Sequence, residues 1–521
     1  MMFGLGIRYL MGWAMAAADG AKKEQVEWPP HPDRVFMALA AAWFETGSDI
    51  SEGEALRWLE QLPAPDITAS GRHVRESVTH FVPVNDTSTP FEDERNGKLA
   101  IPSGEFSIGR PRRPRAFPVA IPFSPVVFIT WNQKIPEIYK NALNSICFKV
   151  TSVGHSASLV QMWLEDNPPP PNLTPVSGLA KHRLRIFGPG RLAYLEQRHN
   201  RKQVLAYAEM ETRVLAAKGK ERSILKGNIA RQFPSGKPVS LRPEPGIWMG
   251  YDTPLPTPAP NIPESHFDSR LVILSLTGKR LPLTASLRLT EAFRGALMSS
   301  CPEPIPEWIS GHALDGSPSK KPHVATLPLP FVGREHADGR LMGIAIALPR
   351  GIDPHEAGRV IEPWLRTEDG LPLKLKIFDG QWLECRAELE TRESPPHSLR
   401  SETWNGPSCR WASVTPIVLD RHFKGKDKWE MAADSLKTAC ERIGLPRPIE
   451  VLLHPVSLIQ GVPKSTEFPN MIRKNNDGQM YHTHAVIVFG EPVHGPVLIG
   501  AGRYRGYGLC RPLQQGGEVH D

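Results

Sequence analysis

The chain reads Gly495-Pro-Val-Leu-Ile-Gly500-Ala-Gly502-Arg503-Tyr504-Arg505-Gly506-Tyr507-Gly508-Leu509-Cys510-Arg511-Pro512 near its C-terminal end. The inner glycines have no Cβ atom to hold the backbone away from a polyanion, and the arginines supply positive charge. The tyrosines offer flat faces on which an unstacked base can lie. We therefore expect single-stranded nucleic acid to bind Gly500, Gly502, Arg503, Tyr504, Arg505, Gly506, Tyr507 and Gly508. A plainer alternative is a glycine-rich turn that closes a surface hairpin.

The elements expected around this glycine-rich loop (residues 500–508) suggest a family. The alternation over residues 484–489 predicts a strand, and the short apolar piece 493–499 predicts one or two helical turns before the loop. Strand, short helix, glycine-rich loop and strand in this order resemble the signature of the CRISPR repeat-cleaving endoribonucleases of the RAMP superfamily. The resemblance implies that the loop grips an RNA repeat. Only three residues separate the inner glycines here, fewer than in many members.

Length and composition bound the class of protein. A chain of 521 residues exceeds one ordinary core, so we expect two or more domains. An apolar content of 40% with 22% charged residues is typical of a folded soluble protein, and 53 prolines argue against a helical bundle. The net charge of +7 favours a polyanionic partner, although solvated surface charge gives the same total.

The six cysteines show no C-x-x-C spacing, and no pair of histidines lies close to any of them in the sequence. We therefore expect reduced structural thiols, no metal site and no cofactor. No stretch reaches the ~18 apolar residues that span a bilayer, and the apolar N-terminus is interrupted by Arg8. These features predict a cytoplasmic protein without a membrane partner.

The N-terminal part begins with a predicted strand over residues 3–10. The motif Glu27-Trp-Pro-Pro-His-Pro-Asp33-Arg34 then opens a helix predicted over residues 34–44, with Asp33 as its N-cap, and a second helix follows at 54–61. This run resembles the start of the CRISPR backbone subunits that hold the 5′ handle of the guide RNA. It looks most like the type I-U (I-G) subunit, in which that domain is fused to the repeat nuclease.

A basic run precedes the strand predicted at residues 126–130. Arginines spaced by prolines on an extended loop can follow a phosphate backbone, and they can also form a solvated face. We expect the first role for Arg110, Arg112, Arg113 and Arg115. A second basic region, residues 181–191 and 198–202, is expected to extend the same groove ahead of a helix near 204–217.

The segment 242–265 is rich in proline, which stiffens a chain and prevents it from joining a sheet. We predict a handle-binding domain at residues 1–241, a linker at 242–265 and a nuclease domain at 266–521.

The C-terminal part has an α+β pattern. A strand at 271–276, a helix at 290–298, strands at 324–327 and 341–348, a helix within 354–365 and a strand at 373–378 give the ferredoxin-like order βαββαβ. A second round comprises a strand at 411–419, a helix at 429–443, a strand at 449–453 and the closing strand with the glycine-rich loop. Two tandem ferredoxin-like folds, at about 266–385 and 405–521, match the resembling family.

RNA can be cut without a metal when its own 2′-hydroxyl attacks the neighbouring phosphate. Such a site needs a base, an acid and cations for the charge that develops on phosphorus. Histidine suits the acid or base role because its ordinary pKa of ~6.5 lies near the working pH.

Histidines after the first helix of the nuclease domain are the candidate catalytic groups. In the resembling family the catalytic histidine commonly follows that helix, a position that His312 occupies here, with Lys320 or Lys321 to stabilise charge. His323 is the second candidate, although a structural histidine bonded to a carbonyl is an equal reading. One of His482 and His484 is expected to face the RNA. The tyrosine that serves as base in some members has no identified counterpart.

Together these features predict a fusion subunit of the type I-U/I-G surveillance complex. It would cut precursor CRISPR RNA within the repeat and stay bound to the guide RNA, with the other subunits of that complex as partners. One alternative is an architectural RNA-binding subunit without activity. Another is a metal-dependent nuclease that uses His312 with Asp315, Glu335 and Asp338.

Overall fold

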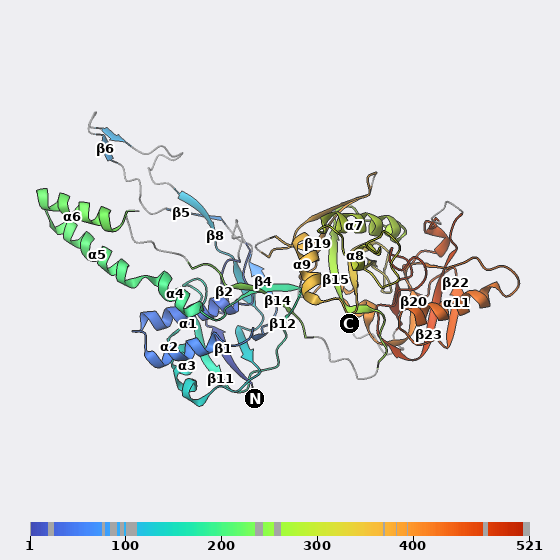
Figure 1. Cartoon of the computed structure of the whole chain (residues 1–521), viewed down its shortest axis with the longest axis horizontal. Helices are drawn as coiled ribbons and strands as arrows, with labels where there is room; N and C mark the ends of the chain where they lie inside the picture. Colours follow the sequence, from blue (N-terminus) through green and yellow to red (C-terminus); the bar gives the residue numbers. More distant parts are fainter. Residues whose placement is uncertain are drawn as a thin grey trace. The chain divides into compact units, whose positions relative to one another are not determined.

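A computed structural model describes residues 2–18, 25–75, 79–83, 91–93, 98–100, 112–234, 243–254, 262–367, 370–381, 383–392, 394–472 and 478–513. The chain divides into two compact units (Figure 1). Unit 1 comprises Met1–Val176 and Arg183–Pro254, and unit 2 comprises Ser177–His182 and Leu255–Asp521. In the described part of the chain, no helix combines the length and apolar character needed to cross a membrane.

Unit 1 contains a ferredoxin-like sheet. Its antiparallel strands lie in the order β11 (Val160–Glu165), β1 (Phe3–Tyr9), β10 (Val126–Trp131) and β3 (Asp66–Thr68). The helices α1 (Pro32–Glu45), α2 (Ile50–Leu59) and α3 (Glu137–Lys149) pack in the same core. Alternate residues of β1, namely Phe3, Leu5 and Ile7, point into this core because successive side chains of a strand face opposite sides.

Smaller sheets complete unit 1. One joins β12 (Thr174–Val176), β14 (Ile247–Asp252) and β13 (His182–Ile186), and another joins β2 (Ala14–Met15), β9 (Val119–Pro122) and β4 (Arg72–Arg75). Two strand pairs follow: β5 (Thr79–Pro83) with β8 (Arg112–Ala116), and β6 (Phe91–Asp93) with β7 (Lys98–Ala100). The helix α4 (Arg191–His199) packs in the core of unit 1 through Leu192 and Leu195, whereas α5 (Arg201–Ala216) and α6 (Gly219–Gln232) project as a helical arm in Figure 1.

The strand β14 corrects one prediction. It lies inside the proline-rich segment that was expected to join no sheet, and it pairs with β12 through residues Gly250 to Asp252. The prolines of this segment flank the strand on both sides, so the run from Ile247 to Asp252 keeps all its backbone N–H donors for pairing.

Unit 2 holds the two predicted ferredoxin-like folds. The first sheet has the order β16 (Ala325–Pro330), β17 (Leu341–Pro349), β15 (Phe267–Thr277), β19 (Glu384–Leu389) and β18 (Leu375–Phe378). It carries α7 (Ser286–Ser300), the short α8 (Glu307–Ser310) and α9 (Pro354–Leu365). The α+β class and the βαββαβ order are confirmed. The strand that pairs with β15 on the side away from β17, however, is β19, which the sequence did not predict. The strands β18 and β19 form a hairpin in which β19 pairs with β15 and β18 lies at the edge of the sheet.

The second sheet has the order β21 (Ile417–Val418), β23 (His482–Val493), β20 (Ser408–Ser413) and β24 (Cys510–Pro512), and β22 (Glu450–His454) also pairs with β23. The helix α11 (Lys428–Arg442) packs against it, and the short α10 (Glu402–Asn405) precedes it. Three single turns of 3-10 helix lie at Leu283–Ala285, His397–Leu399 and Ser465–Glu467.

The helical turns predicted at residues 493–499 are absent. Val497, Leu498 and Ile499 are all buried, and Leu498 forms a β-bridge to Leu509. A single helical turn on a surface would leave one of three successive side chains in water, whereas here neighbours cover all of them. The piece is therefore extended. The predicted strand 411–419 is likewise divided into β20 and β21.

Candidate active site

The first candidate residue, His312, stands on a small hairpin that follows α8. Gly311 ends α8 with a φ of 72°, a left-handed conformation that favours glycine, and the backbone of His312 then bridges to that of Pro318. Ser319 returns an N–H to the carbonyl of Gly311 over 2.8 Å. The side chain of His312 is exposed at this hairpin, so a ligand can reach it.

The second candidate, His323, lies at the other end of the same loop and stacks on Tyr504 of the glycine-rich loop. The ring centroids are 3.6 Å apart and the planes are inclined by 24°. Arg503 adds its guanidinium at 4.6 Å from the Tyr504 ring centroid. The side-chain Nδ1 of His323 is buried and has no hydrogen-bond partner among the described residues.

Burial, together with the charge of Arg294, lowers the pKa of His323 to about 4, and Arg503 and His312 act in the same direction. Arg294 stands on α7 and donates from Nη2 to the carbonyl of Ser310 over 2.6 Å, which fixes it behind the loop. His323 is therefore neutral at pH 7.

The glycine-rich loop is anchored to the first ferredoxin-like fold at both sides of Tyr504. Thr326 of β16 donates its hydroxyl to the carbonyl of Tyr504 over 3.4 Å, and Thr290 of α7 donates to the carbonyl of Arg505 over 2.8 Å. The guanidinium of Arg505 pairs with Glu291 on the same helix. These contacts hold Tyr504 against His323, with Arg503 beside the Tyr504 ring.

The glycines of this loop serve its own packing, which corrects the expectation that they open the backbone to a polyanion. A Cβ on Gly508 would lie 1.8 Å from the carbonyl oxygen of Ile499, and one on Gly506 would lie 2.6 Å from Thr290. Gly500 and Gly502 are equally enclosed by Val418 and Tyr507. All four are buried, so they let the loop fold tightly.

Tyr507 does not offer a face for stacking. Its ring is 0% exposed, and its hydroxyl donates to the carbonyl of Pro469 over 2.7 Å. Tyr507 is thus a core residue of unit 2, in contrast to the half-buried Tyr504.

The histidines of β23 are also interior, which corrects the expectation that one of them faces RNA. His482 is 7% exposed and its Nε2 meets the carbonyl of Ser465 at 2.8 Å. His484 is 1% exposed, and its ring nitrogens meet Ser413 Oγ at 2.9 Å and the carbonyl of Pro463 at 3.1 Å. Both nitrogens of His484 thus have partners within the protein, whereas the buried Nδ1 of His482 has no hydrogen-bond partner among the described residues.

The cations predicted around the site differ in their surroundings. Lys321 is exposed and pairs with Glu307 at 3.3 Å, whereas Lys320 is exposed on the same loop. In the basic run, Arg110 lies outside the described residues. Arg112 and Arg113 belong to β8, with side chains outside the described part, and Arg115 is exposed on that strand.

A family model described as "CRISPR-associated protein, GSU0054 family" matches residues 3–172 and 272–512, most of both units. The chain belongs to the GSU0054 family. Two solved structures resemble this GSU0054-family protein over 47% of its length. One is a "CRISPR associated protein Cas6" (13% identity, 98% of that chain, TM-score 0.25), and the other is a Cas6 product complex (17% identity, 99% of that chain, TM-score 0.23). No curated protein matches the sequence.

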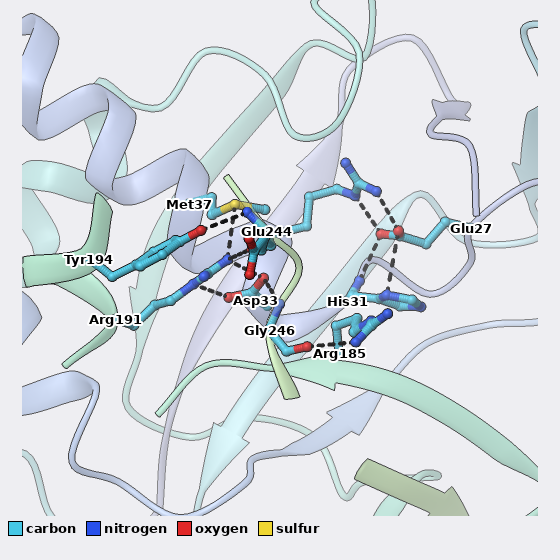
Figure 2. A network of polar contacts seen from close by, with 10 residues as sticks. Glu27, His31, Asp33, Met37, Arg185, Arg191, Tyr194, Glu244 and Gly246 are labelled. Carbon is cyan, nitrogen blue, oxygen red and sulfur yellow. Dashed lines mark hydrogen bonds and ion pairs between the residues drawn. The ribbon is translucent and has the colours of Figure 1, made fainter. Parts of the chain in front are cut away.

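In unit 1 of the GSU0054-family protein, the motif at residues 27–34 forms a polar network (Figure 2). The carboxylate of Asp33 accepts hydrogen bonds from Arg191 Nε, Arg191 Nη2 and the backbone N–H of Gly246, each at 2.8 Å. Asp33 therefore joins α1 to α4 and to the start of β14. The prediction that Asp33 caps α1 is wrong, because the helix begins at Pro32 with His31 at the N-cap.

Glu27 forms the other half of this network. Its carboxylate accepts from Arg34 Nε and Nη2 at 2.6 Å and from the backbone N–H of His31 at 3.0 Å. Burial opposes the charged carboxylate, but the charges of His31 and Arg34 outweigh it, so the pKa of Glu27 is lowered. The motif thus holds the entry to α1 in place. Arg191 is committed to the same network and does not extend a basic groove, as was expected of its region.

Sequence reasoning missed two parts of the site. Arg294 lies within the α7 pattern, where an arginine reads as a solvated helix residue, so no signal in the sequence marks it. The stacking of Tyr504 on His323 joins residues that are far apart in the chain, and only the tertiary contact reveals it.

Two further findings concern the chemistry available. All six cysteines are unpaired, as expected, and burial raises the pKa of the Cys147 thiol to about 12, which makes it unreactive. Within the described ranges, no three His, Cys, Asp or Glu side chains gather in a way that could hold a metal ion.

Proposed function

We propose that this CRISPR-associated protein is a metal-independent endoribonuclease that cuts precursor CRISPR RNA within the repeat and keeps the product as a subunit of a type I-U/I-G surveillance complex. The observation that carries the proposal is the stacking of His323 on Tyr504, with Arg503 and Arg294 nearby, on the same loop that bears the exposed His312. It supplies proton-transfer groups beside cations and an aromatic face, which are the groups that cleavage of single-stranded RNA requires.

In the proposed reaction the RNA 2′-hydroxyl loses its proton and attacks the adjacent phosphorus. The bond from phosphorus to the 5′-oxygen breaks, and that oxygen gains a proton, which leaves a 2′,3′-cyclic phosphate and a free 5′-hydroxyl. His312 is the principal proton-transfer group, because its exposed ring can contact the RNA. Arg503 and Lys320 would stabilise the charge that develops on the phosphoryl oxygens.

His323 takes a supporting role in this proposal. Its neutral ring holds Tyr504 by stacking and can accept a hydrogen bond, but a base with a pKa of about 4 binds a proton weakly at neutral pH. A bound phosphate would add negative charge beside it and raise that pKa. His323 therefore remains the second candidate for proton transfer.

Unit 1 would hold the 5′ handle of the guide RNA. Its strand β13 places Arg185 at 3.7 Å and Arg183 at 5.4 Å from the ring centroid of Trp248 on β14. Guanidinium groups over an indole form a surface suited to RNA bases and phosphates. The arginines of β8 would add to it, with Arg115 exposed and Arg112 and Arg113 on the same strand.

Single-turnover cleavage of repeat RNA in EDTA tests the activity. His312→Ala should slow cleavage by about 10²- to 10⁴-fold while RNA affinity stays nearly constant, because a proton-transfer group acts mainly in the transition state. His336→Ala is the matched control, since that histidine is 89% exposed on a turn of the same unit. If His312→Ala cleaves RNA at the wild-type rate and His323→Ala does not cleave it, then His323 is the principal proton-transfer group and His312 is not.

The same assay separates the alternatives. RNA that is bound but intact would indicate an architectural subunit, and cleavage restored by Mg²⁺ with 5′-phosphate ends would indicate a metal-dependent nuclease. The acidic residues considered for that reading have local partners: Asp315 accepts from Ser317, and Asp338 pairs with Arg340.

A further inference from the structure

A second site in unit 2 lies at the N-terminal end of α11. There the chain leaves β21 at Leu419 and enters β23 after Tyr481, and a cavity of about 300 Å³ opens between these segments. Leu419 and Ala432 form its buried floor, at 4% and 1% exposed. Neither the glycine-rich loop nor the candidate histidines line it.

Exposed aromatic rings form the walls of this cavity, which we name the α11 pocket. Trp429 is 45% exposed and Tyr481 is 46% exposed, although residues of this size are usually well covered in a folded protein. Their ring centroids are 6.2 Å apart with an interplanar angle of 57°, and His422 meets Tyr481 at 6.5 Å and 73°. Because the rings are tilted rather than stacked on each other, they leave ring faces open to a flat ligand.

The polar lining of the α11 pocket is basic. Lys424 and Lys428 line it together with His422, and no carboxylate does. Lys428 Nζ lies 5.3 Å from the ring centroid of Trp429, at the first position of α11. The same helix end also carries Asp427 at the N-cap and Glu430 in the first turn, so the positive charge that faces the pocket comes from Lys424 and Lys428 and not from the helix dipole. No ion pair joins Lys424 or Lys428 to a carboxylate within the part of the chain that is described.

The α11 pocket adjoins the glycine-rich loop through two backbone hydrogen bonds. Ala501 donates to the carbonyl of Val418 over 2.9 Å, and the next residue, Leu419, donates to the carbonyl of Tyr481 over 2.9 Å. The pocket and the loop are therefore neighbours within unit 2.

We propose that the α11 pocket takes one unstacked base of single-stranded RNA, with the base against Trp429 and Tyr481 and its phosphate near Lys424 and Lys428. Aromatic faces beside lysines recognise such a nucleotide by stacking and charge, without a requirement for one base. The inference rests on the proposed function for its ligand class. It adds a contact outside the cleavage site that positions the RNA rather than acting in the reaction.

The test uses the full chain with two RNAs: the repeat, and a single-stranded oligouridine that carries 4-thiouridine. Trp429→Ala should weaken binding of the oligouridine by about 5- to 150-fold, the loss expected for one stacking contact. Trp429→Phe should restore most of the affinity, which excludes misfolding as the cause. Phe378→Ala is the matched control, because Phe378 is an exposed aromatic residue of unit 2 with a lysine over its ring, away from the pocket.

Crosslinks from 4-thiouridine to Trp429 or Tyr481, read by mass spectrometry, would support the proposal. Unchanged oligouridine affinity in Trp429→Ala overturns it even when repeat RNA is bound and cut as proposed. If the wild-type chain leaves repeat RNA uncut while Trp429→Ala still loses the oligouridine, the pocket stands and the proposed reaction fails. If Trp429→Ala loses binding of another protein and no RNA crosslink forms in the pocket, the proposal is also overturned, because the α11 pocket would then be a protein-binding site.

Discussion

Replacing His484 by glutamine should make unit 2 less sensitive to acid. The ring of His484 is buried between Ser413 and Pro463, and a carbonyl can only accept, so Nε2 carries the proton and Nδ1 accepts from the Ser413 hydroxyl. The Ser413 oxygen in turn accepts from the backbone N–H of Ala485 over 3.0 Å. A second proton on Nδ1 would meet a hydroxyl that already donates to it, and it would carry charge into the core.

The magnitude follows from the pKa. Burial lowers the pKa of His484 to about 4, against an ordinary value of ~6.5 in the unfolded chain. Between these values the unfolded state binds more protons, so stability is fully present above about pH 6.5 and is lost as the pH falls toward about 4. One such group contributes about 3 kcal/mol to the change in the free energy of unfolding over that range, because each pKa unit corresponds to ~1.4 kcal/mol.

The assay compares slopes rather than absolute stabilities. Urea titrations across this pH range, followed by hydrogen exchange in the peptide that contains β23, report the unfolding free energy of this sheet. His484→Gln keeps an N–H near the carbonyl of Pro463 but removes the titrating group. Between pH 6.5 and pH 4, the free energy of unfolding of this variant should therefore decrease by about 3 kcal/mol less than that of the wild type.

His454→Gln serves as the control, since His454 pairs with His484 across β22 and β23 but its side chain is exposed. This variant should keep the wild-type pH dependence. His323 and His397 also have a pKa lowered to about 4, so the wild-type chain will remain acid-sensitive overall and only the difference between variants is diagnostic. An identical pH dependence in His484→Gln and the wild type would refute the reasoning.

Three further outcomes follow from the contacts described. Arg191→Met should destabilise unit 1 by about 3–5 kcal/mol in urea unfolding, because it leaves the Asp33 carboxylate buried without its cation, and adding Asp33→Leu should recover much of the loss; equal losses in both variants would count against this. Arg503→Ala should weaken repeat binding and reduce the salt slope of log K by about 1, with a smaller effect for Arg505→Ala, which already has an acidic partner; unchanged affinity in both would remove the loop from the RNA site. Gly506→Ala should destabilise unit 2 by more than about 1 kcal/mol, since φ is 82° and the new Cβ meets a threonine at 2.6 Å; wild-type urea stability would contradict the packing role.

Local pattern accounts for most of what the sequence predicted correctly. The helix expected within residues 354–365 is α9 with the same bounds, and the predicted strands at 271–276 and 341–348 lie within β15 and β17. In such segments the spacing of apolar residues predicts which face of the helix or strand is buried. The order of these elements then allows few sheet topologies, which is why the ferredoxin-like folds of unit 2 could be predicted.

The errors arose where neighbours decide the outcome. The hairpin of β18 and β19 places its second strand next to β15 and its first strand at the edge of the sheet, and nothing in the local pattern distinguishes the two strands. The alternation of His482 and His484 suggested a side chain facing RNA, but the loop containing Ser465 covers that face of β23. The alternation of residues along a strand predicts which side of the sheet a side chain faces, but it does not predict whether a distant segment covers that side.

The sequence by itself determined the α+β class, the tandem ferredoxin-like order and the loop residues from which the site is built, because these depend on residue type and spacing along one segment. Only the tertiary structure decided that Tyr504 stacks on His323, that burial together with the charge of Arg294 lowers the pKa of that imidazole, and that Tyr507 is interior. Those features depend on which surfaces meet when two sheets of unit 2 pack together. Thr326 and the Tyr504 carbonyl, 178 residues apart, are held together by that packing and by no local preference of either segment.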